Sequence, residues 1–382
     1  MKKSLFAIAA VTAFAGAAQA QSSVTVYGIM DVGYQGKNAR ASTGVKTQSS
    51  SFGDSAEQSS RLGFKGTEDL GGGASAFFTI ETGLTQSSSL YSTNNTRQAF
   101  VGLKKNGIGQ LAAGTQYTPV FNSTAATDPG QGNNTVGSVI YPQGGNASSA
   151  QASADVAMTI RMNNALTVKS DNFAGATVGG MYSMKNTDTS MTSGTNGGTS
   201  NVTLWGVNAD YTWNKLYVTA AYQSYSSEND SGTASFATTS AATVSSQTPA
   251  FTVTNGRDNQ TYAGATYDFG ILKAYAGYTN RKVTSNINSN EFLKRSGQQL
   301  GVRSYITPTI EGWASVGNGR YSAYGTSQPT ANFTAYQLGA NYYLSKRTNL
   351  YGIFGSAQVS SASASVQGNT VNAYALGVRH TF

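Results

Sequence analysis

Apolar and polar residues alternate one by one along much of this 382-residue chain. In residues 334–344 one parity holds Tyr336, Leu338, Ala340, Tyr342 and Leu344, and the other holds Gln337, Gly339 and Asn341. Residues 374–382 repeat the pattern, with one parity made of Tyr374, Leu376, Val378, His380 and Phe382. Successive side chains of a β-strand point to opposite faces, so this period predicts strands with one apolar and one polar face.

Segments that contain arginines follow the alternation to different degrees. In residues 160–169 the apolar parity holds Met162, Leu166 and Val168, and the polar parity holds Arg161, Asn163, Thr167 and Lys169. Arg61 lies on the polar parity of its own segment in the same way. Around Arg97, however, the same parity contains Ala99, Val101 and Leu103. The pattern therefore points Arg61 and Arg161 to the polar face and leaves the direction of Arg97 open.

Two kinds of connector take turns between the predicted strands. The short ones are rich in Gly, Asn, Asp and Pro, as tight antiparallel turns are: 67–73, 106–109, 171–175, 212–215, 268–270, 307–309 and 345–348. The long ones are rich in Ser, Thr, Asn and Gly: 35–57, 84–95, 117–155, 186–200, 227–258, 283–296, 321–332 and 359–370. Pairing each long connector with its flanking strands gives about 16 strands, with both chain ends on the side of the short turns.

Composition supports strands and indicates export. Tyr and Phe number 22 and 16, and Gly numbers 44 against 6 Pro, a balance that favours long, regular strands. Lys2 and Lys3, the apolar run 5–18 and the Ala18-Gln19-Ala20 site predict a signal peptide over residues 1–20 that is cleaved. That run is shorter than the roughly 20 residues that a spanning helix requires. Residues 21–382 are then expected to form a single domain.

These features together predict an all-β fold, a 16-stranded antiparallel transmembrane β-barrel. Its apolar face would contact lipid and its polar face would line a water-filled interior, with short periplasmic turns and long extracellular loops. Without Lys2 and Lys3 the excess of basic over acidic residues falls from 8 to 6. The basic residues are scattered, which favours an interior that attracts anions over a nucleic-acid-binding surface.

Six segments carry a family resemblance. They are 24–31 (VTVYGIMD), 60–73 (SRLGFKGTEDLGGG), 96–104 (TRQAFVGLK), 161–166 (RMNNAL), 344–351 (LSKRTNLY) and 376–382 (LGVRHTF). In their order and spacing the chain resembles the general porins of β-proteobacterial outer membranes, over essentially its whole mature length. The resemblance implies a homotrimer of 16-stranded barrels, each with its own water-filled channel. The third long loop is expected to fold inward and narrow that channel.

The same resemblance implies a charged pore constriction. Its basic cluster would be Arg61, Arg97 and Arg161, and its acidic side would come from the third loop. Asp128, followed by Pro129, matches the family pattern there, and Asp155 is a second candidate. Clustered arginines in a narrow pore favour anions. A structural role, in which the arginines bond the loop to the barrel wall, is an alternative that can hold at the same time.

The closing strand has an implied role as well. Its apolar face would lie against lipid, with Phe382 at the periplasmic interface, and the strand would close the barrel against the segment near Val24. In the family, a strand that ends on Phe is also what the outer-membrane assembly machinery recognises. The resemblance assigns that role to Tyr374, Val378 and Phe382.

Little in the sequence supports catalysis or a cofactor. His380 is the one histidine, and it lies near a strand end on the apolar face, so a Ser-His-Asp site could be built only around it. The chain has no Cys, which argues against a soft-metal site, while a Ca²⁺ site made of loop carboxylates stays open. We expect no enzyme activity, no cofactor and no metal.

The expected function is a general diffusion porin of the Gram-negative outer membrane, a weakly anion-selective channel for passive transport of small hydrophilic solutes. One alternative is a substrate-preferring channel for phosphate or other anions on the same barrel. A second is a non-channel secreted β adhesin, which should show short uniform repeats that this chain lacks. The expected partners are two further copies of the chain, outer-membrane lipid and lipopolysaccharide, the assembly machinery and small hydrophilic or anionic solutes, and no nucleic acid.

Overall fold

The structure is a computed structural model that describes residues 23–84, 96–142, 158–189, 198–230, 241–245, 254–324 and 328–382. Its first strands are β1 (Ser23–Arg40), β2 (Lys46–Asp54), β3 (Arg61–Gly71), β4 (Ala74–Gly83), β5 (Thr96–Lys105), β6 (Gly109–Tyr117), β7 (Arg161–Ser170), β8 (Ala176–Thr189) and β9 (Gly198–Trp213). The others are β10 (Leu216–Asn229), β11 (Gly256–Asp268), β12 (Lys273–Ser285), β13 (Phe292–Thr307), β14 (Ile310–Ala323), β15 (Thr330–Tyr343), β16 (Thr348–Val359) and β17 (Asn369–Thr381). The expected signal peptide lies outside the described residues, as does Asp155.

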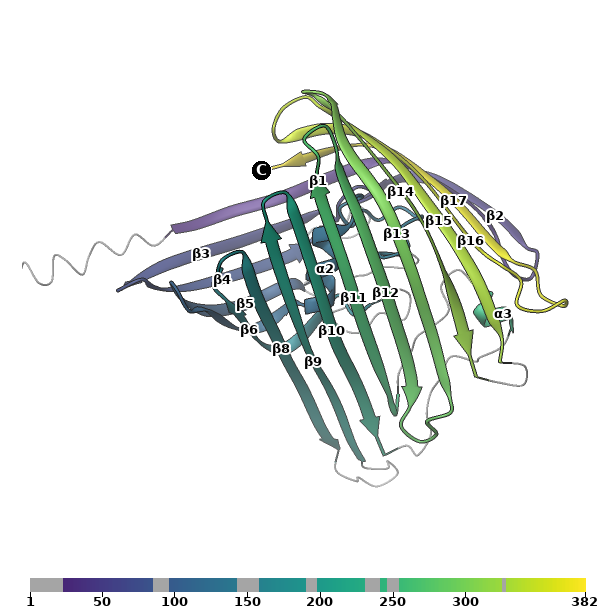
Figure 1. Ribbon diagram of the computed structural model, residues 1–382, viewed down its shortest axis with the longest axis horizontal. Coiled ribbons are helices and arrows are strands. Elements are labelled where there is room, and N and C mark those ends of the chain that lie inside the picture. The colour runs from purple at the N-terminus through teal and green to yellow at the C-terminus, as the bar shows by residue number, and fades with distance from the viewer. Residues whose placement is uncertain are drawn as a thin grey trace, which may run out of the picture.

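The strands form a closed 16-stranded antiparallel β-barrel (Figure 1). The seventeen described strands fill sixteen places because β2 and β3 share one. Residues 23–29 of β1 pair with β3, whereas residues 32–40 pair with β2. The chain between β2 and β3 bends at Ser55, where φ is 64°. The prediction of a 16-stranded barrel is therefore confirmed.

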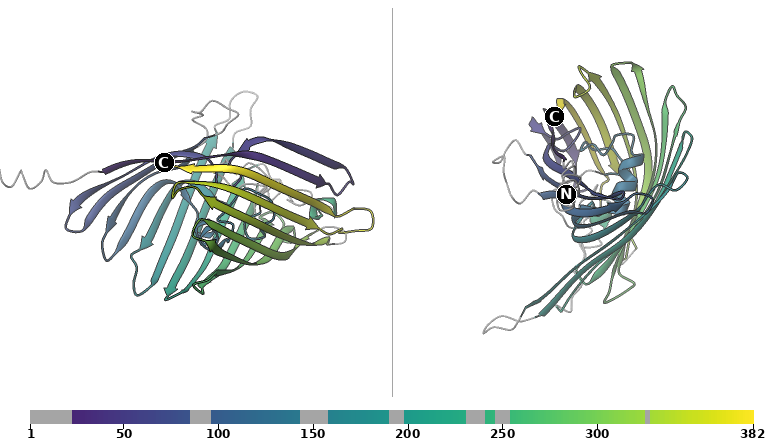
Figure 2. Two further views of the ribbon diagram at one scale, coloured as in Figure 1. Left: turned by 90° about the horizontal axis from the view of Figure 1, so that it is seen from above. Right: turned by 90° about the vertical axis from the view of Figure 1, so that its left-hand side faces the viewer.

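The first and last strands close the barrel. Residues 29–40 of β1 pair with residues 370–381 of β17, and the purple and yellow ribbons lie side by side in Figure 2. At the end of this seam the Phe382 amide donates to the Gly28 carbonyl at 3.1 Å, and the Gly28 amide donates back at 3.0 Å. The predicted closure near the start of the mature chain is confirmed.

The predicted short turns are confirmed, but the long connectors are shorter than predicted. Tight turns join β3 to β4, β5 to β6, β7 to β8, β9 to β10, β11 to β12, β13 to β14 and β15 to β16. The segment expected as a loop at 35–57 is instead mostly a hairpin of β1 and β2, and only 286–291 separate β12 from β13. Strand ends with water on both sides lose the alternation that reveals strands in the sequence, which explains the error.

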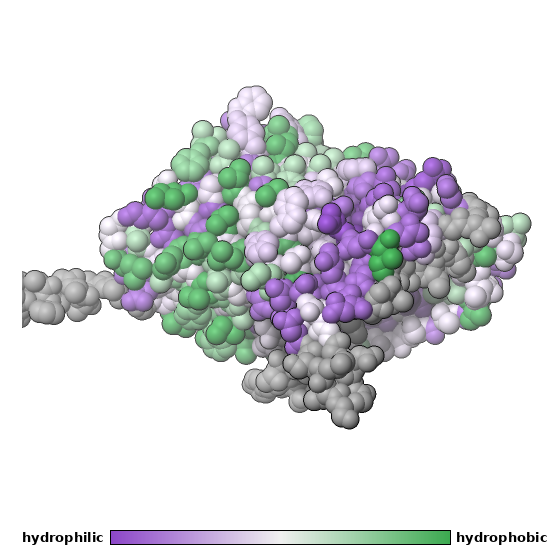
Figure 3. Space-filling model, turned by 90° about the horizontal axis from the view of Figure 1, so that it is seen from below, coloured by the Kyte–Doolittle hydropathy of each residue, from purple (hydrophilic) through white to green (hydrophobic). Residues whose placement is uncertain are grey.

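Face alternation in the middle of the barrel follows the sequence closely. On β15 Tyr336, Leu338 and Tyr342 are 42%, 54% and 48% exposed on the outer face. Gln337 and Asn341 are buried on the inner face. Figure 3 shows hydrophobic residues gathered over one part of the exterior and hydrophilic residues over another. The exterior is therefore apolar where it must contact lipid.

Strand β7 departs from the prediction at Met162. Gly114 pairs with Ala165 and Gln116 with Met162, so Asn163 and Asn164 both stand opposite one residue of β6. Asn164 has a φ of 51°, a value that Asn tolerates better than most residues. This β-bulge reverses the parity, so Met162 is buried and packs against interior residues such as Met181 and Leu204 rather than lipid.

Two helices occur among the described residues, α2 (Pro119–Thr127) and α3 (Ala241–Val244). Neither is long and apolar enough to cross a membrane. Helix α2 begins the third long loop, with Thr118 as the N-cap and Pro119 in the first turn, where its missing N–H is not needed. The helix lies within the barrel and faces β9, β10 and β11 (Figure 1). The predicted inward fold of the third loop is therefore confirmed.

Candidate functional site

The third loop is fastened to the barrel wall by four inward glutamines on β10, β11, β13 and β15. The side-chain carbonyls of Gln223, Gln260 and Gln299 accept from the amides of Val120, Thr159 and Val139, at 3.1, 2.7 and 2.6 Å. The amide of Gln337 donates to the carbonyls of Thr135 and Val136 at 2.6 and 3.0 Å. These neutral bonds satisfy loop backbone groups that the inward fold removes from water.

The sequence analysis missed this set of glutamines. Each has the inward parity of its strand, and all four are buried. An amide side chain can donate and accept at once, so it can pair with irregular backbone of either polarity. A glutamine in the middle of an inward parity was the available signal.

The three predicted arginines come together on the wall formed by β3, β5 and β7. The Arg97 Nε donates to Glu81 Oε1 at 2.7 Å, and Arg97 Nη2 donates to the Tyr117 hydroxyl at 2.8 Å. Arg61 Nη1 lies 4.0 Å from the same Glu81 oxygen. The Arg161 guanidinium lies over the Tyr117 ring, 5.8 Å from its centroid. Glu81 and Tyr117 therefore stand at the centre of this arginine cluster.

Arg97 faces inward because of a β-bulge. Glu81 pairs with Gln98, but the next residue, Thr82, pairs with Thr96, so Arg97 has no partner in the ladder. The extra residue reverses the parity, and Val101 and Leu103 face outward at 61% and 57% exposure. A clean alternation in the sequence could not show this direction.

Glu81 is the carboxylate that contacts the arginine cluster, and the sequence analysis did not single it out. It is 3% exposed and also accepts from the Tyr27 hydroxyl at 3.1 Å. Three guanidinium groups thus share one carboxylate, which leaves a local surplus of positive charge. Such a surplus raises the local concentration of anions.

Asp128 lies elsewhere in the third loop. Its carboxylate accepts from the Gly132 amide at 2.7 Å and from Gln299 Nε2 at 3.2 Å. Burial raises the pKa of the Asp128 carboxyl above its usual range. These partners belong to the loop and to β13, so Asp128 shapes the turn after α2 and does not bond the arginine cluster. Asp155, the other expected acid, lies outside the described residues.

A polar cavity of about 410 Å³ adjoins the arginine cluster. It lies between helix α2 and the wall, and Tyr117 lines it as well as holding Arg97. Its other polar lining residues include Gln98, Gln116, Asn208 and Asp210. The surplus positive charge therefore stands beside a space that water and small solutes can enter.

On the far wall the arginines are paired one to one. Arg281 and Asp258 form a buried ion pair at 2.7 Å. Arg303 and Glu311 form a two-pronged pair at 2.6 Å on each prong, and Arg303 Nη1 also donates to the Pro129 carbonyl. These pairs add no net charge to the interior.

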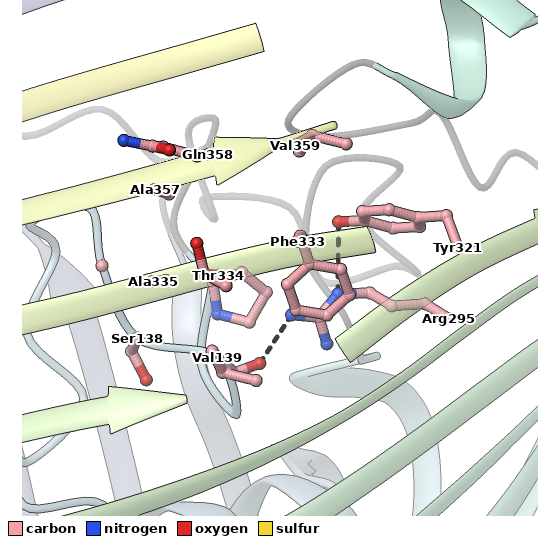
Figure 4. A pocket seen from close by; sticks show the side chains of 12 residues that line it. Ser138, Val139, Arg295, Tyr321, Phe333, Thr334, Ala335, Ala357, Gln358 and Val359 are labelled. Atoms are coloured by element: carbon pink, nitrogen blue, oxygen red, sulfur yellow. Dashed lines mark hydrogen bonds between the residues drawn. The ribbon is translucent and has the colours of Figure 1, made fainter. Parts of the chain in front are cut away.

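Arg295 fastens the loop in another way, shown in Figure 4. Its Nη2 donates to the Val139 carbonyl at 2.6 Å, and its Nε donates to the Tyr321 hydroxyl at 3.2 Å. Its guanidinium lies 4.5 Å from the centroid of the Phe333 ring. Backbone and aromatic partners therefore hold this buried cation against the loop.

The closing strand places Tyr374, Val378 and Phe382 on the outer face, where each is more than a third exposed. The Phe382 ring lies over Gly28, at which any Cβ would overlap it. His380 is exposed, and its Nδ1 is 2.9 Å from the Thr348 hydroxyl. Within the described residues no three His, Cys, Asp or Glu side chains gather as a metal site.

Comparison with known sequences gives one family. A family model described as Gram-negative porin matches residues 7–362. Outer membrane porin protein 32 of Delftia acidovorans is 30% identical over 361 residues, which cover 92% of this chain and 88% of that protein. An outer membrane porin protein of Bordetella pertussis is 37% identical over 142 residues, but this match spans only 37% of that relative and 34% of this chain.

Solved structures show the same fold. An anion-selective porin from Comamonas acidovorans matches with a TM-score of 0.69 at 22% identity, covering 95% of this chain and all of that one. The outer-membrane-expressed OmpT of Vibrio cholerae matches with a TM-score of 0.62 at 13% identity, covering 94% and 98%. The sequence relatives are porins and the structural neighbours are barrels of the outer membrane. The chain belongs to the Gram-negative porin family and is a protein of the outer membrane.

Proposed function

We propose that this porin is a passive channel with a weak preference for anions, through which small hydrophilic solutes diffuse. The observation that carries the proposal is the arginine cluster, in which Arg61, Arg97 and Arg161 meet the single carboxylate of Glu81 beside a polar cavity. A solute that passes this point meets positive charge that the wall does not cancel. Three basic groups in a partly dehydrated passage lower the barrier for anions more than for cations.

The fold and the relatives are those of channels, and we infer that the chain catalyses no reaction. We also propose that three copies associate, as the family resemblance implies, and that residues 1–20 are removed on export. Tyr374, Val378 and Phe382 are proposed to be read by the assembly machinery. Deleting Phe382 should lower the amount of folded barrel in outer-membrane fractions, and an undiminished amount would count against that role.

The test is conductance in a planar lipid bilayer under a salt gradient. The mature chain should insert to give stepwise currents, with a reversal potential on the anion side. Steps that come in threes would support the trimer. A complete absence of conductance from folded barrels would overturn the channel, whereas conductance with a cation-side reversal potential would overturn only the anion preference.

A further inference from the structure

A row of four basic side chains crosses the outer face of β11, β12, β13 and β14 at the end that carries the long loops. Its members are Arg257, Lys282, Lys294 and Arg320. These four strands are neighbours in the barrel wall, drawn in green in Figure 1. Each of the four has the outward parity of its strand, because Asp258, Arg281, Arg295 and Tyr321 beside them are buried inside. The charges of this basic row are therefore not part of the pore lining.

Strand register makes the basic row continuous. Lys282 stands directly opposite Lys294 in the ladder. Arg257 is a diagonal neighbour of Lys282, because Lys282 pairs with Asn259. Arg320 is a diagonal neighbour of Lys294, because Lys294 pairs with Ser322. Directly opposite residues have Cβ atoms about 5 Å apart, and diagonal ones about 7–8 Å, so the four charges lie within reach of one another.

The row has no carboxylate to balance it among the described residues. None of its four side chains takes part in an ion pair there. Glu228, near the end of β10, instead accepts from Asn286 Nδ2 at 3.0 Å, and Glu291 accepts from Asn288 Nδ2 at 3.2 Å. Like charges placed directly opposite on a sheet destabilise it. The Lys282–Lys294 pair is thus an arrangement that an external anion would relieve.

The depth of the row indicates which anion. The apolar outer face ends at Tyr278 on β12 and Val316 on β14, which are 44% and 61% exposed. Lys282 and Arg320 each come four residues later, about 14 Å along the strand and about 10 Å along the membrane normal once strand tilt is included. Long basic side chains at this height can extend down to the headgroup layer. The row therefore stands where the headgroups of the outward-facing leaflet lie.

Two contacts keep the row's side chains at the surface. The Lys282 ammonium lies over the Phe292 ring, 5.0 Å from its centroid. Arg320 Nε donates to Asn332 Oδ1 at 3.2 Å, which leaves its two terminal nitrogens facing outward. Guanidinium and ammonium groups fixed side by side match phosphate oxygens well.

We propose that the basic row binds the phosphate groups of a lipid in the outward-facing leaflet, of the kind that phosphorylated glycolipids such as lipopolysaccharide carry. The lipid lies alongside β11–β14, and its phosphates bridge Lys282 and Lys294. The barrel is thereby fixed in depth and sealed to its surroundings on this side. This binding is separate from conduction, because the row and the arginine cluster lie on opposite faces of the wall.

The test uses the full mature chain in phosphatidylcholine vesicles, with and without diphosphorylated lipid A, and measures the temperature at which the barrel unfolds. Lipid A should raise this temperature by several degrees for the wild type and by little for Lys282→Gln/Lys294→Gln. Without lipid A the same variant should be at least as stable as the wild type, because its like-charge contact is gone. A matched control, Lys346→Gln/Arg347→Gln, removes two exposed charges from a short turn at the other end and should keep the full shift.

Further arms separate the outcomes. Dephosphorylated lipid A and inorganic phosphate should both leave the unfolding temperature of the wild type unchanged. An equal shift with dephosphorylated lipid A would overturn a phosphate site, and an equal shift with inorganic phosphate would overturn a lipid site. Retention of the full shift by Lys282→Gln/Lys294→Gln would overturn the proposal as well. The Lys282→Arg/Lys294→Arg variant should restore the shift, and reversal potentials should not change in any of these variants.

Discussion

Arginines line two sides of the barrel interior, and the two sides balance them differently. On β3, β5 and β7, Arg61, Arg97 and Arg161 share Glu81. About half-way round the ring, on β12 and β13, Arg281 and Arg303 each have a carboxylate of their own. A paired arginine holds the wall and the loop together without changing the potential in the lumen. An arginine in surplus has its charge available to a passing solute, so the comparison separates structural from functional arginines.

The largest effect is expected from removing the surplus. Arg61→Ala/Arg97→Ala/Arg161→Ala should move the reversal potential to the cation side, because Glu81 then remains as the charged group of the cluster. A unit charge about 4 Å from an ion contributes about 1 kcal/mol in water, so each arginine should change the anion-to-cation permeability ratio roughly fivefold at most. Single-channel measurements in a salt gradient give this ratio.

A matched control for that experiment removes three charges from the outer face. Lys282→Gln/Lys294→Gln/Arg320→Gln lowers the net charge by the same amount without touching the lumen. Its permeability ratio should equal that of the wild type. If the control changes selectivity as much as the triple alanine variant does, the position of the charge is irrelevant and the comparison fails.

The next effect concerns stability on the far wall. Arg303→Ala leaves the Glu311 carboxylate buried without its partner, and removing one member of a buried pair typically costs about 3–5 kcal/mol. Urea unfolding in detergent or lipid should show this loss, with little change in selectivity. Arg303→Met/Glu311→Leu removes both charges and should recover most of it. Arg97→Ala should lose less than Arg303→Ala, since Glu81 keeps Tyr27 and Arg61.

A smaller effect is expected where the loop is held by neutral groups. Gln299→Ala deprives the Val139 amide of its acceptor and Asp128 of a donor. An unsatisfied buried group costs about 1–3 kcal/mol, so the third loop should loosen and single-channel conductance should rise or become noisy. Gln298→Ala, on the exposed outer face of the same strand, is the control and should behave as the wild type.

The smallest effect is a dependence of stability on pH through Asp128. Burial raises the pKa of this carboxyl in the folded state, so the folded protein binds its proton more tightly than the unfolded chain does. Stability should therefore decrease as pH rises from the ordinary aspartate pKa through the raised one. The difference in unfolding temperature between wild type and Asp128→Asn, followed over pH, isolates this contribution. A difference that does not vary with pH would contradict it.

The regular part of the fold could be predicted from the sequence because period-two alternation is directly visible there. Strand β15 and the short turns follow the pattern without exception. The errors fall where the period breaks. The bulge at Asn163–Asn164 turned Met162 inward, and the bulge at Arg97 made its parity uninformative.

The candidate site was less predictable for a different reason. Arg61, Arg97 and Arg161 could be named from the family resemblance, but their carboxylate partner could not, because Glu81 approaches them only through the closed register of β3, β4 and β5. The four glutamines were missed because their partners are backbone groups of a loop far away in sequence. Pairing between irregular backbone and wall leaves no periodic trace in a sequence.

The glutamine fastening has a consequence for the behaviour of the channel in concentrated salt. Dissolved ions shorten the range of the arginine cluster's field, from about 10 Å at 0.1 M to about 3 Å at 1 M. They weaken a bond between a neutral amide and a peptide group far less. The aperture set by Gln223, Gln260, Gln299 and Gln337 should therefore keep its width as ionic strength rises, while discrimination between anions and cations fades. Sieving by size and sorting by charge are separately built in this barrel.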